Sequence, residues 1–249
     1  MDELMVDFEL AAKKFYPIKR DNKYGFIDKE GSEMLPFEFD WADFFSEGIA
    51  IVEKDDFVGA INKQGTVIIP FEYSEIERFN NGIAVVSKQG KFGLINKLNQ
   101  LILPLEYDEI IDFIADWIEP FNVDGLARAR VGSKYGVFAN NGSMIVDFQF
   151  ENISEFSNGY ALVADSTNKY SFINEIGKLI STMSFDFIPE ALSFSKFSKE
   201  GFAKVITKGK IGIIDTTGEK VVPAIFDAIG VYLPKGLTAV KKKGKWGFM

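Results

Sequence analysis

The sequence predicts an all-β protein made of tandem three-stranded antiparallel meanders. Two observations lead to this fold class. A small residue preceded by an aromatic or large apolar residue returns every 34 to 43 residues, and β-branched runs alternate with turn residues along the chain. Units of this length cannot bury a core alone and must stack on one another. We therefore expect a single domain over residues 1–249, a closed propeller-like ring of seven units or, alternatively, an open β superhelix.

The small residue, which we call the anchor, defines the register of the repeat. The anchors are Gly25, Gly59, Gly93, Gly136, Ser171, Gly212 and Gly247. Residues 82–108 form the clearest unit: β-branched and apolar residues at 82–86, 91–95 and 101–107 predict three strands, with turns at 87–90 and 96–99. Residues 108–110 begin a longer connection to the following unit.

Glycine occupies two positions of the repeat for two different reasons. Three residues after the anchor stands Asp or Asn in most units, and six residues after it stands Gly, or Asn99 in one unit. This Asp/Asn-x-x-Gly pattern predicts a hairpin whose last residue has positive φ, which asparagine tolerates best after glycine. The anchor differs, because its one replacement is Ser171, which has no preference for positive φ. The anchor therefore needs a small side chain to allow a close approach.

Other positions mark edges and insertions. Proline at 36, 70, 104 and 223 lies 11 residues after its anchor and predicts a sheet edge or strand end. Two segments lengthen the period. In the segment 111–123 apolar residues recur at helical spacing up to Pro120, which predicts a short amphipathic helix. The segment 189–198 is expected to be a loop.

The two ends of the chain complement each other. The C-terminal unit stops after its second strand, at Trp246 to Met249. Residues 4–10 resemble residues 144–150, the third strand of another unit, and 15–20 match a first strand. The N-terminal segment would thus complete the last unit, which is how propellers close. The alternative is a capping helix over residues 3–15.

Composition excludes several classes of function. The net charge is −8, and the chain has no cysteine and no histidine. These features exclude thiol and histidine chemistry and argue against a nucleic-acid binder or a classical zinc site. We expect no cofactor. We also expect no membrane insertion, because no signal peptide or long apolar run is present. A cytoplasmic, monomeric protein that is not an enzyme is the expectation.

Several local patterns could carry chemistry, but each has a structural explanation. The Asp/Asn-x-x-Gly turns supply too few oxygens for calcium. Repeated carboxylates such as Glu72 and Asp108 are expected to be solvated. The basic run 241–245 could contact nucleic acid, although a solvated hairpin tip fits the overall charge better. The aromatics after each anchor could line a carbohydrate groove, although their place in strands favours the core.

The repeat resembles the bacterial WG repeat, also called the KWG repeat. Lys245-Trp246-Gly247 is the literal motif, and Lys91-Phe92-Gly93 and Lys134-Tyr135-Gly136 are close variants. The resemblance covers roughly residues 15–249; Val58, Ile211 and Ser171 depart from it in the motif. It implies an interaction repeat without catalytic residues.

These observations lead to a non-enzymatic scaffold that binds a protein partner. The negative charge suits a basic partner, such as a toxin that this protein neutralises. The alternatives are a carbohydrate or cell-envelope binder and, with less support, an accessory domain of an enzyme. Because near-identical units offer near-identical surfaces, specificity is expected from the insertions. The candidate partner-binding residues are the insertion aromatics Trp117, Phe121, Phe194 and Phe197.

Overall fold

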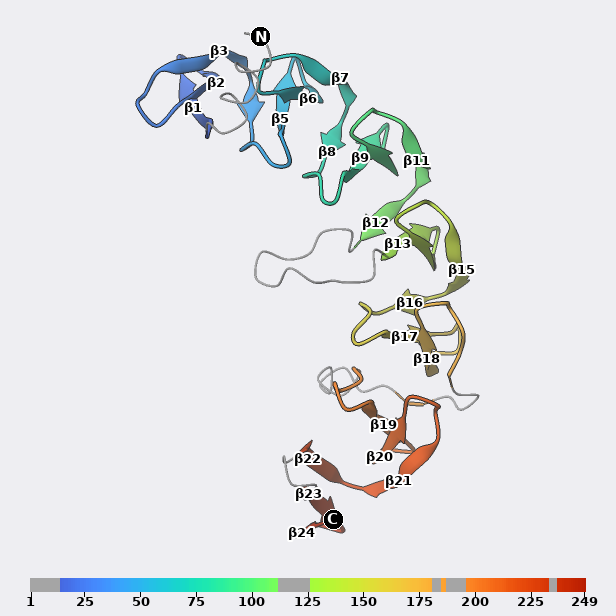
Figure 1. Ribbon diagram of the computed structural model, residues 1–249. Helices are drawn as coiled ribbons and strands as arrows, with labels where there is room; N and C mark the ends of the chain where they lie inside the picture. Colours follow the sequence, from blue (N-terminus) through green and yellow to red (C-terminus); the bar gives the residue numbers. More distant parts are fainter. Residues whose placement is uncertain (1–13, 112–125, 181–184, 187–195, 233–236) are drawn as a thin grey trace, which may run out of the picture. The chain divides into compact units, whose positions relative to one another are not determined.

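The structure, a computed structural model, describes residues 14–111, 126–180, 185–186, 196–232 and 237–249. All regular elements in these ranges are β-strands, which confirms the predicted all-β class. Figure 1 shows them as a succession of small antiparallel sheets. The chain divides into two compact units, residues 1–118 with 140–142 and residues 119–139 with 143–249. The predicted helix of the first insertion lies outside the described residues.

The first unit contains β1 to β12, which form three successive sheets and a final short strand. The strands are β1 (Tyr16–Arg20), β2 (Lys23–Ile27), β3 (Glu33–Phe39), β4 (Trp41–Ala42), β5 (Ile49–Lys54), β6 (Phe57–Asn62), β7 (Val67–Tyr73), β8 (Glu75–Ile76), β9 (Ile83–Lys88), β10 (Lys91–Asn96), β11 (Leu101–Tyr107) and β12 (Glu109–Ile111). The sheet orders are β1-β2-β3, β4-β5-β6-β7 and β11-β10-β9-β8.

The second unit repeats this arrangement from β13 to β24. The strands are β13 (Leu126–Val131), β14 (Lys134–Ala139), β15 (Met144–Phe150), β16 (Asn152–Ile153), β17 (Tyr160–Ala164), β18 (Tyr170–Asn174), β19 (Phe202–Thr207), β20 (Lys210–Asp215), β21 (Lys220–Phe226), β22 (Ala228–Tyr232), β23 (Thr238–Lys242) and β24 (Lys245–Phe248). Strands β13-β14-β15, β16-β17-β18, β19-β20-β21 and β22-β23-β24 are consecutive neighbours in their sheets.

A fourth strand corrects the prediction of three-stranded units. One residue separates β4 from the end of β3. β4 pairs with β5 of the next sheet, with Trp41 opposite Glu53 and Ala42 opposite Val52. β8 does the same one residue after β7. At both places a single residue links the long third strand of one sheet to the short first strand of the next sheet. The sheets β4–β7 and β8–β11 therefore have the four strands of a propeller blade.

The core lies between successive sheets within a unit. Ile51 and Ile69 of one sheet pack in one cluster with Val86 and Ile95 of the next, and all four side chains are almost fully buried. Burying a side chain of this kind contributes about 1.5–3 kcal/mol. No sheet could obtain this burial alone, which agrees with the expectation that the repeats stack.

The structure confirms both predicted roles of glycine. The turn residues have positive φ, from +57° at Asn99 to +85° at Gly31. At the anchor Gly93, a Cβ atom would lie 2.8 Å from the carbonyl oxygen of Leu103 on the neighbouring strand. That strand bulges opposite the anchor, because Phe92 pairs with Tyr107 whereas Leu94 pairs with Leu103. Pro104 lies in this bulge of an edge strand, as the edge prediction required.

Candidate functional site

The four aromatics predicted to bind a partner are only partly described. Trp117, Phe121 and Phe194 lie outside the described residues. Phe197 is 2 % exposed and packs against Tyr160 and Phe172, with ring centroids 4.5 and 4.9 Å apart. This placement corrects the expectation for Phe197, because its ring belongs to the core of the second unit and is not available to a partner. The sequence suggested exposure because the residue lies in a loop.

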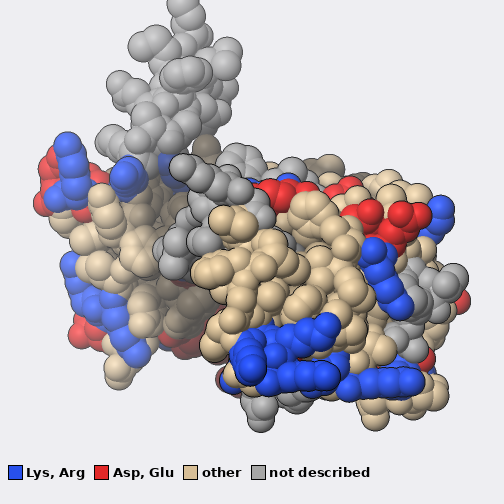
Figure 2. Space-filling view, turned by 90° about the horizontal axis from the view of Figure 1, so that it is seen from below, with Lys and Arg blue, Asp and Glu red and all other residues tan. Residues whose placement is uncertain are grey.

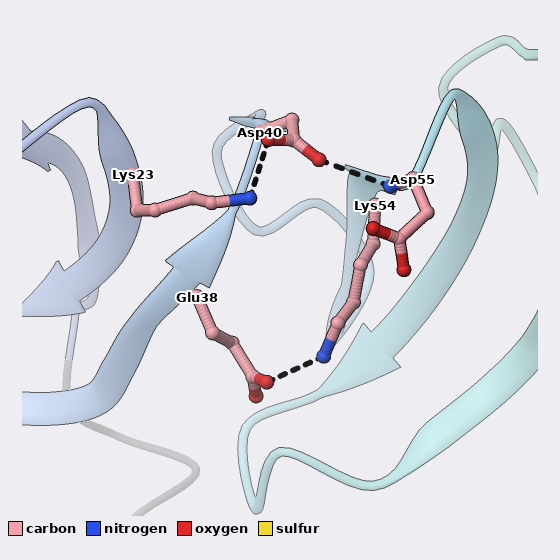
Figure 3. Close-up of polar contacts among 5 residues, drawn as sticks. All are labelled: Lys23, Glu38, Asp40, Lys54 and Asp55. Atoms are coloured by element: carbon pink, nitrogen blue, oxygen red, sulfur yellow. Dashed lines mark hydrogen bonds and ion pairs between the residues drawn. The ribbon is translucent and has the colours of Figure 1, made fainter.

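The structure contains polar contacts that join one sheet to the next, and we call these contacts clasps. In the first clasp, Asp40 lies at the single residue between β3 and β4 (Figure 3). Its carboxylate accepts a hydrogen bond from Lys23 Nζ at 2.5 Å and another from the backbone N–H of Asp55 at 3.0 Å. Lys23 belongs to β2, whereas Asp55 lies at the tip of the next hairpin. One carboxylate therefore holds two sheets together.

The lysine–carboxylate pair of this clasp recurs with a fixed spacing of 17 residues, and we call each such pair a clasp. Further pairs are Lys91–Asp108 and Lys134–Glu151, each at 2.7 Å, and Lys169–Asp186 at 2.5 Å, together with Lys210–Asp227. Asp186 and Asp227 also accept backbone N–H groups of the following hairpin tip, at Lys208 and Gly244. In one repeat both partners are replaced together, by Phe57 and Ser74. The joint replacement indicates that the two positions act as a pair.

The clasps change the acidity of their carboxylates. Hydrogen bonding to Lys23 and then to the Asp55 N–H lowers the pKa of Asp40. The pKa of Asp227 is lowered first by Lys210 and then by the Gly244 N–H. The pKa values of Asp186 and Glu151 are likewise lowered, chiefly by hydrogen bonds from their lysines. These carboxylates are thus held in the ionised form, which suits a structural contact rather than proton transfer.

Where the clasp is missing, other contacts join the same two sheets. Arg78 donates to both carboxylate oxygens of Asp43, from Nε at 2.5 Å and from Nη2 at 2.6 Å. Glu47 accepts the backbone N–H groups of Asn81 and Gly82 and forms an ion pair with Lys97 at 2.9 Å. The pair β4–β7 and β8–β11 is therefore joined through the residues that follow β4.

The hairpin tips between the first two long strands of a sheet are the variable part of the repeat. In five tips both central residues have positive φ, the geometry of a type I′ turn: Asp21-Asn22, Asp55-Asp56, Gln89-Gly90, Lys208-Gly209 and Lys243-Gly244. The backbone is the same in each, but the charge changes from two carboxylates at 55–56 to lysines at 208 and 243. Because the tips are exposed, alike in backbone conformation and different in charge, they are the best candidate contact sites for a partner.

Among the residues that the structure describes, no group of three or more Asp or Glu side chains is placed to hold a metal ion. Within the same ranges, no helix is long and apolar enough to span a membrane. The lysine–carboxylate spacing of 17 was visible in the sequence, but the bond from the next hairpin tip to the carboxylate was not.

Comparison with known proteins agrees with the repeat. The model of the family described as "WG containing repeat" matches residues 24–56, 59–92, 92–135, 136–165 and 211–246, well over half of the chain. No curated protein matches. Similar solved structures include a eukaryotic initiation factor, which is 9% identical with a TM-score of 0.43; the match covers 92% of this chain and 78% of that chain. BamB from Moraxella catarrhalis is also 9% identical, with a TM-score of 0.36, and its match covers 95% of this chain and 81% of that chain. Hsv2p from Kluyveromyces lactis is similar at 13% identity, with 82% and 71% covered and a TM-score of 0.35.

Proposed function

We propose, from the premise that this chain belongs to the family of WG containing repeats, that it is a non-enzymatic scaffold that binds another protein. The observation that carries this proposal is the contrast between a repeated framework and variable tips. Anchors, turns and clasps recur from sheet to sheet, whereas the exposed side chains of the hairpin tips do not. Repeat arrays of this kind commonly present such surfaces to partners.

The partner that suits the chain as a whole is basic. The net charge is −8, and Asp55 and Asp56 stand side by side at an exposed tip of the first unit. Charge complementarity at such a rim increases the rate of association and selects the partner. A basic protein that this scaffold binds or neutralises is therefore our first candidate.

The test is affinity capture from the native cell with two variants of the protein. In Asp55→Asn/Asp56→Gly the tip becomes Asn-Gly, the preferred sequence of a type I′ turn, so both charges are removed without a cost to the fold. We expect the variant to capture clearly less of the partner than the wild type. Glu30→Gln/Glu175→Gln, which removes two negative charges at other exposed positions, should capture it normally. Equal capture by all three proteins would refute the role of this tip.

The insertion aromatics Trp117, Phe121 and Phe194 remain proposed contacts for the same partner. Trp117→Ala separates binding from packing. A contact residue would reduce capture and leave the melting temperature nearly unchanged. A packed residue would lower the melting temperature, by about 2–4 °C per kcal/mol for a chain of this size. A stable variant with full capture would remove Trp117 from the site.

The scaffold is further proposed to close into a ring of seven sheets. Phe248 is 72 % exposed, whereas the equivalent Leu94 is fully buried beneath the third strand of its sheet. Among the described residues, β24 pairs only with β23, and a Cβ atom on Gly247 would meet nothing within 4 Å. Residues 4–10, which resemble the third strand at 144–150, are the proposed cover for this edge.

Closure makes a specific prediction about register. Val137 pairs with Val146, and by the same register Phe248 would lie opposite Val6. Since the chain has no cysteine, Val6→Cys/Phe248→Cys should form an intramolecular disulfide under mild oxidation, while the shifted pair Asp7→Cys/Phe248→Cys should not. Equal cross-linking of both pairs, or of neither, would count against the ring.

A further inference from the structure

The last part of the chain has a charge opposite to that of the rest. Residues 201–249 contain nine lysines and three acidic residues, in a protein whose net charge is −8. Five of these lysines lie in or next to two hairpin turns: Lys208 and Lys210 where β19 turns into β20, and Lys242, Lys243 and Lys245 where β23 turns into β24. All five are exposed. We call these five residues the lysine rim.

The two tips of the lysine rim are neighbours in space. The carboxylate of Asp227 accepts one bond from Lys210 Nζ and another from the backbone N–H of Gly244, the latter at 3.1 Å. At the other tip, the backbone N–H of Lys208 donates a hydrogen bond to the carboxylate of Asp186, which also accepts one from Lys169 Nζ. Figure 2 shows several groups of Lys and Arg side chains on the face that it draws.

Two of these lysines occupy a backbone conformation that does not favour lysine. Lys208 and Lys243 both have a φ of +51° and both precede glycine in a type I′ turn. Asparagine is the residue that this position prefers, and Asp21-Asn22 shows that the repeat can supply small polar residues there. Residues held in unfavourable conformations gather at functional sites, so the same choice at two adjacent tips indicates a requirement for positive charge.

We infer that the lysine rim binds a short acidic segment of a protein partner. This inference rests on the proposed scaffold function and names a second contact chemistry for it. A short segment fits better than a nucleic acid or a membrane surface, because a longer polyanion would extend onto the acidic remainder of the chain. Repulsion between like charges acts over about 8 Å at physiological salt, which limits a favourable ligand to the rim itself.

The test measures binding of a labelled short oligoglutamate peptide to the full chain. Lys208→Asn/Lys243→Asn removes two charges and gives both turns their preferred Asn-Gly sequence, so the variant should be at least as stable as the wild type. We expect its affinity for the peptide to fall about three- to tenfold, since exposed charge pairs contribute modestly. Lys242→Gln/Lys245→Gln, which changes the strand ends and leaves the turns intact, should weaken binding similarly.

The control Lys29→Asn/Lys178→Asn has the same net charge as the first variant and should bind the peptide like the wild type. An oligothymidylate of equal length and vesicles containing phosphatidylserine should bind more weakly than the peptide. The inference is overturned if the wild type does not bind the peptide, if the control loses as much affinity as the rim variants, or if the oligonucleotide or the vesicles bind more tightly. Capture of a basic partner through Asp55 and Asp56 would survive any of these results.

Discussion

The tip of the β5–β6 hairpin and the tip of the β23–β24 hairpin have the same backbone and opposite charge. Lys54 pairs with Phe57 and Lys242 with Lys245, and the two residues between have positive φ in both hairpins. In both, the acidic residue that directly follows the preceding third strand accepts an N–H of the tip, Asp40 in one case and Asp227 in the other. The framework therefore determines where a tip lies, whereas the charge of the tip changes from one hairpin to the other.

The largest expected effect comes from breaking the shared framework. Gly93→Val would place a Cβ atom 2.8 Å from the carbonyl oxygen of Leu103, and a main-chain neighbour cannot move away without disturbing the sheet. We expect a loss of about 3 kcal/mol in the free energy of unfolding, measured with urea. Gly31→Asn is the matched control, because its site has open space and a φ of +85° that asparagine tolerates. Similar losses for both variants would contradict the two roles of glycine.

Acidification should weaken the clasps throughout the chain. Because the folded-state pKa of Asp40, Glu151, Asp186 and Asp227 is lowered, their contribution is fully present above the unfolded pKa of about 4 and is lost as pH falls through the folded value. The free energy of unfolding should thus be steady near neutral pH and decrease below about pH 5. Asp40→Asn/Asp227→Asn should show a shallower decrease. An identical slope for this variant would mean that the clasps do not stabilise the fold.

A smaller effect should follow from restoring the missing clasp. Phe57→Lys/Ser74→Asp places the usual pair at the junction between β4–β7 and β8–β11. In a double-mutant cycle the two changes should couple favourably by about 0.5 kcal/mol, as expected for an exposed ion pair. The same pair of changes in reverse, Lys91→Phe/Asp108→Ser, should show the loss of that coupling. Additive effects would show that the spacing of 17 is incidental.

The smallest expected effect is at the lysine rim itself. Lys243→Asn should stabilise the protein by about 0.5 kcal/mol, because asparagine adopts positive φ more readily than lysine. Thermal unfolding measures this change, and Lys245→Asn, which lies in β24 outside the turn, should not produce it. Destabilisation by Lys243→Asn would remove the argument that this lysine is retained for its charge.

Much of the fold could be predicted from the sequence because its signals are local and repeated. Asn99 in place of a turn glycine and Ser171 in place of an anchor were sufficient to distinguish the two glycine sites. The fourth strands could not be predicted, since two residues such as Trp41 and Ala42 carry no periodicity. The clasps were missed because the lysine and the carboxylate lie 17 residues apart, on or next to neighbouring strands, and the N–H group that Asp40 or Asp227 also accepts comes from the next hairpin tip.

The candidate site was predicted less well than the fold. Aromatics in an insertion suggested exposure, but whether a ring is buried depends on the surface it meets. Phe197 meets Tyr160 and Phe172 and becomes part of the core. The tips were recognised as hairpins from the sequence. Their shared turn geometry, and the contact of two of them with the same carboxylate of Asp227, could be seen only in the structure.

The central claim, that tip residues determine binding on a fixed framework, is tested most directly by exchanging one tip for the other. Asp55→Lys/Asp56→Gly/Phe57→Lys gives the β5–β6 hairpin the tip sequence of 242–245. Quantitative capture of the partner that the wild type binds is the measurement, made on a variant whose urea unfolding matches the wild type within about 0.5 kcal/mol. The account predicts that the folded variant loses this partner. Capture at wild-type strength by the exchanged tip would contradict it.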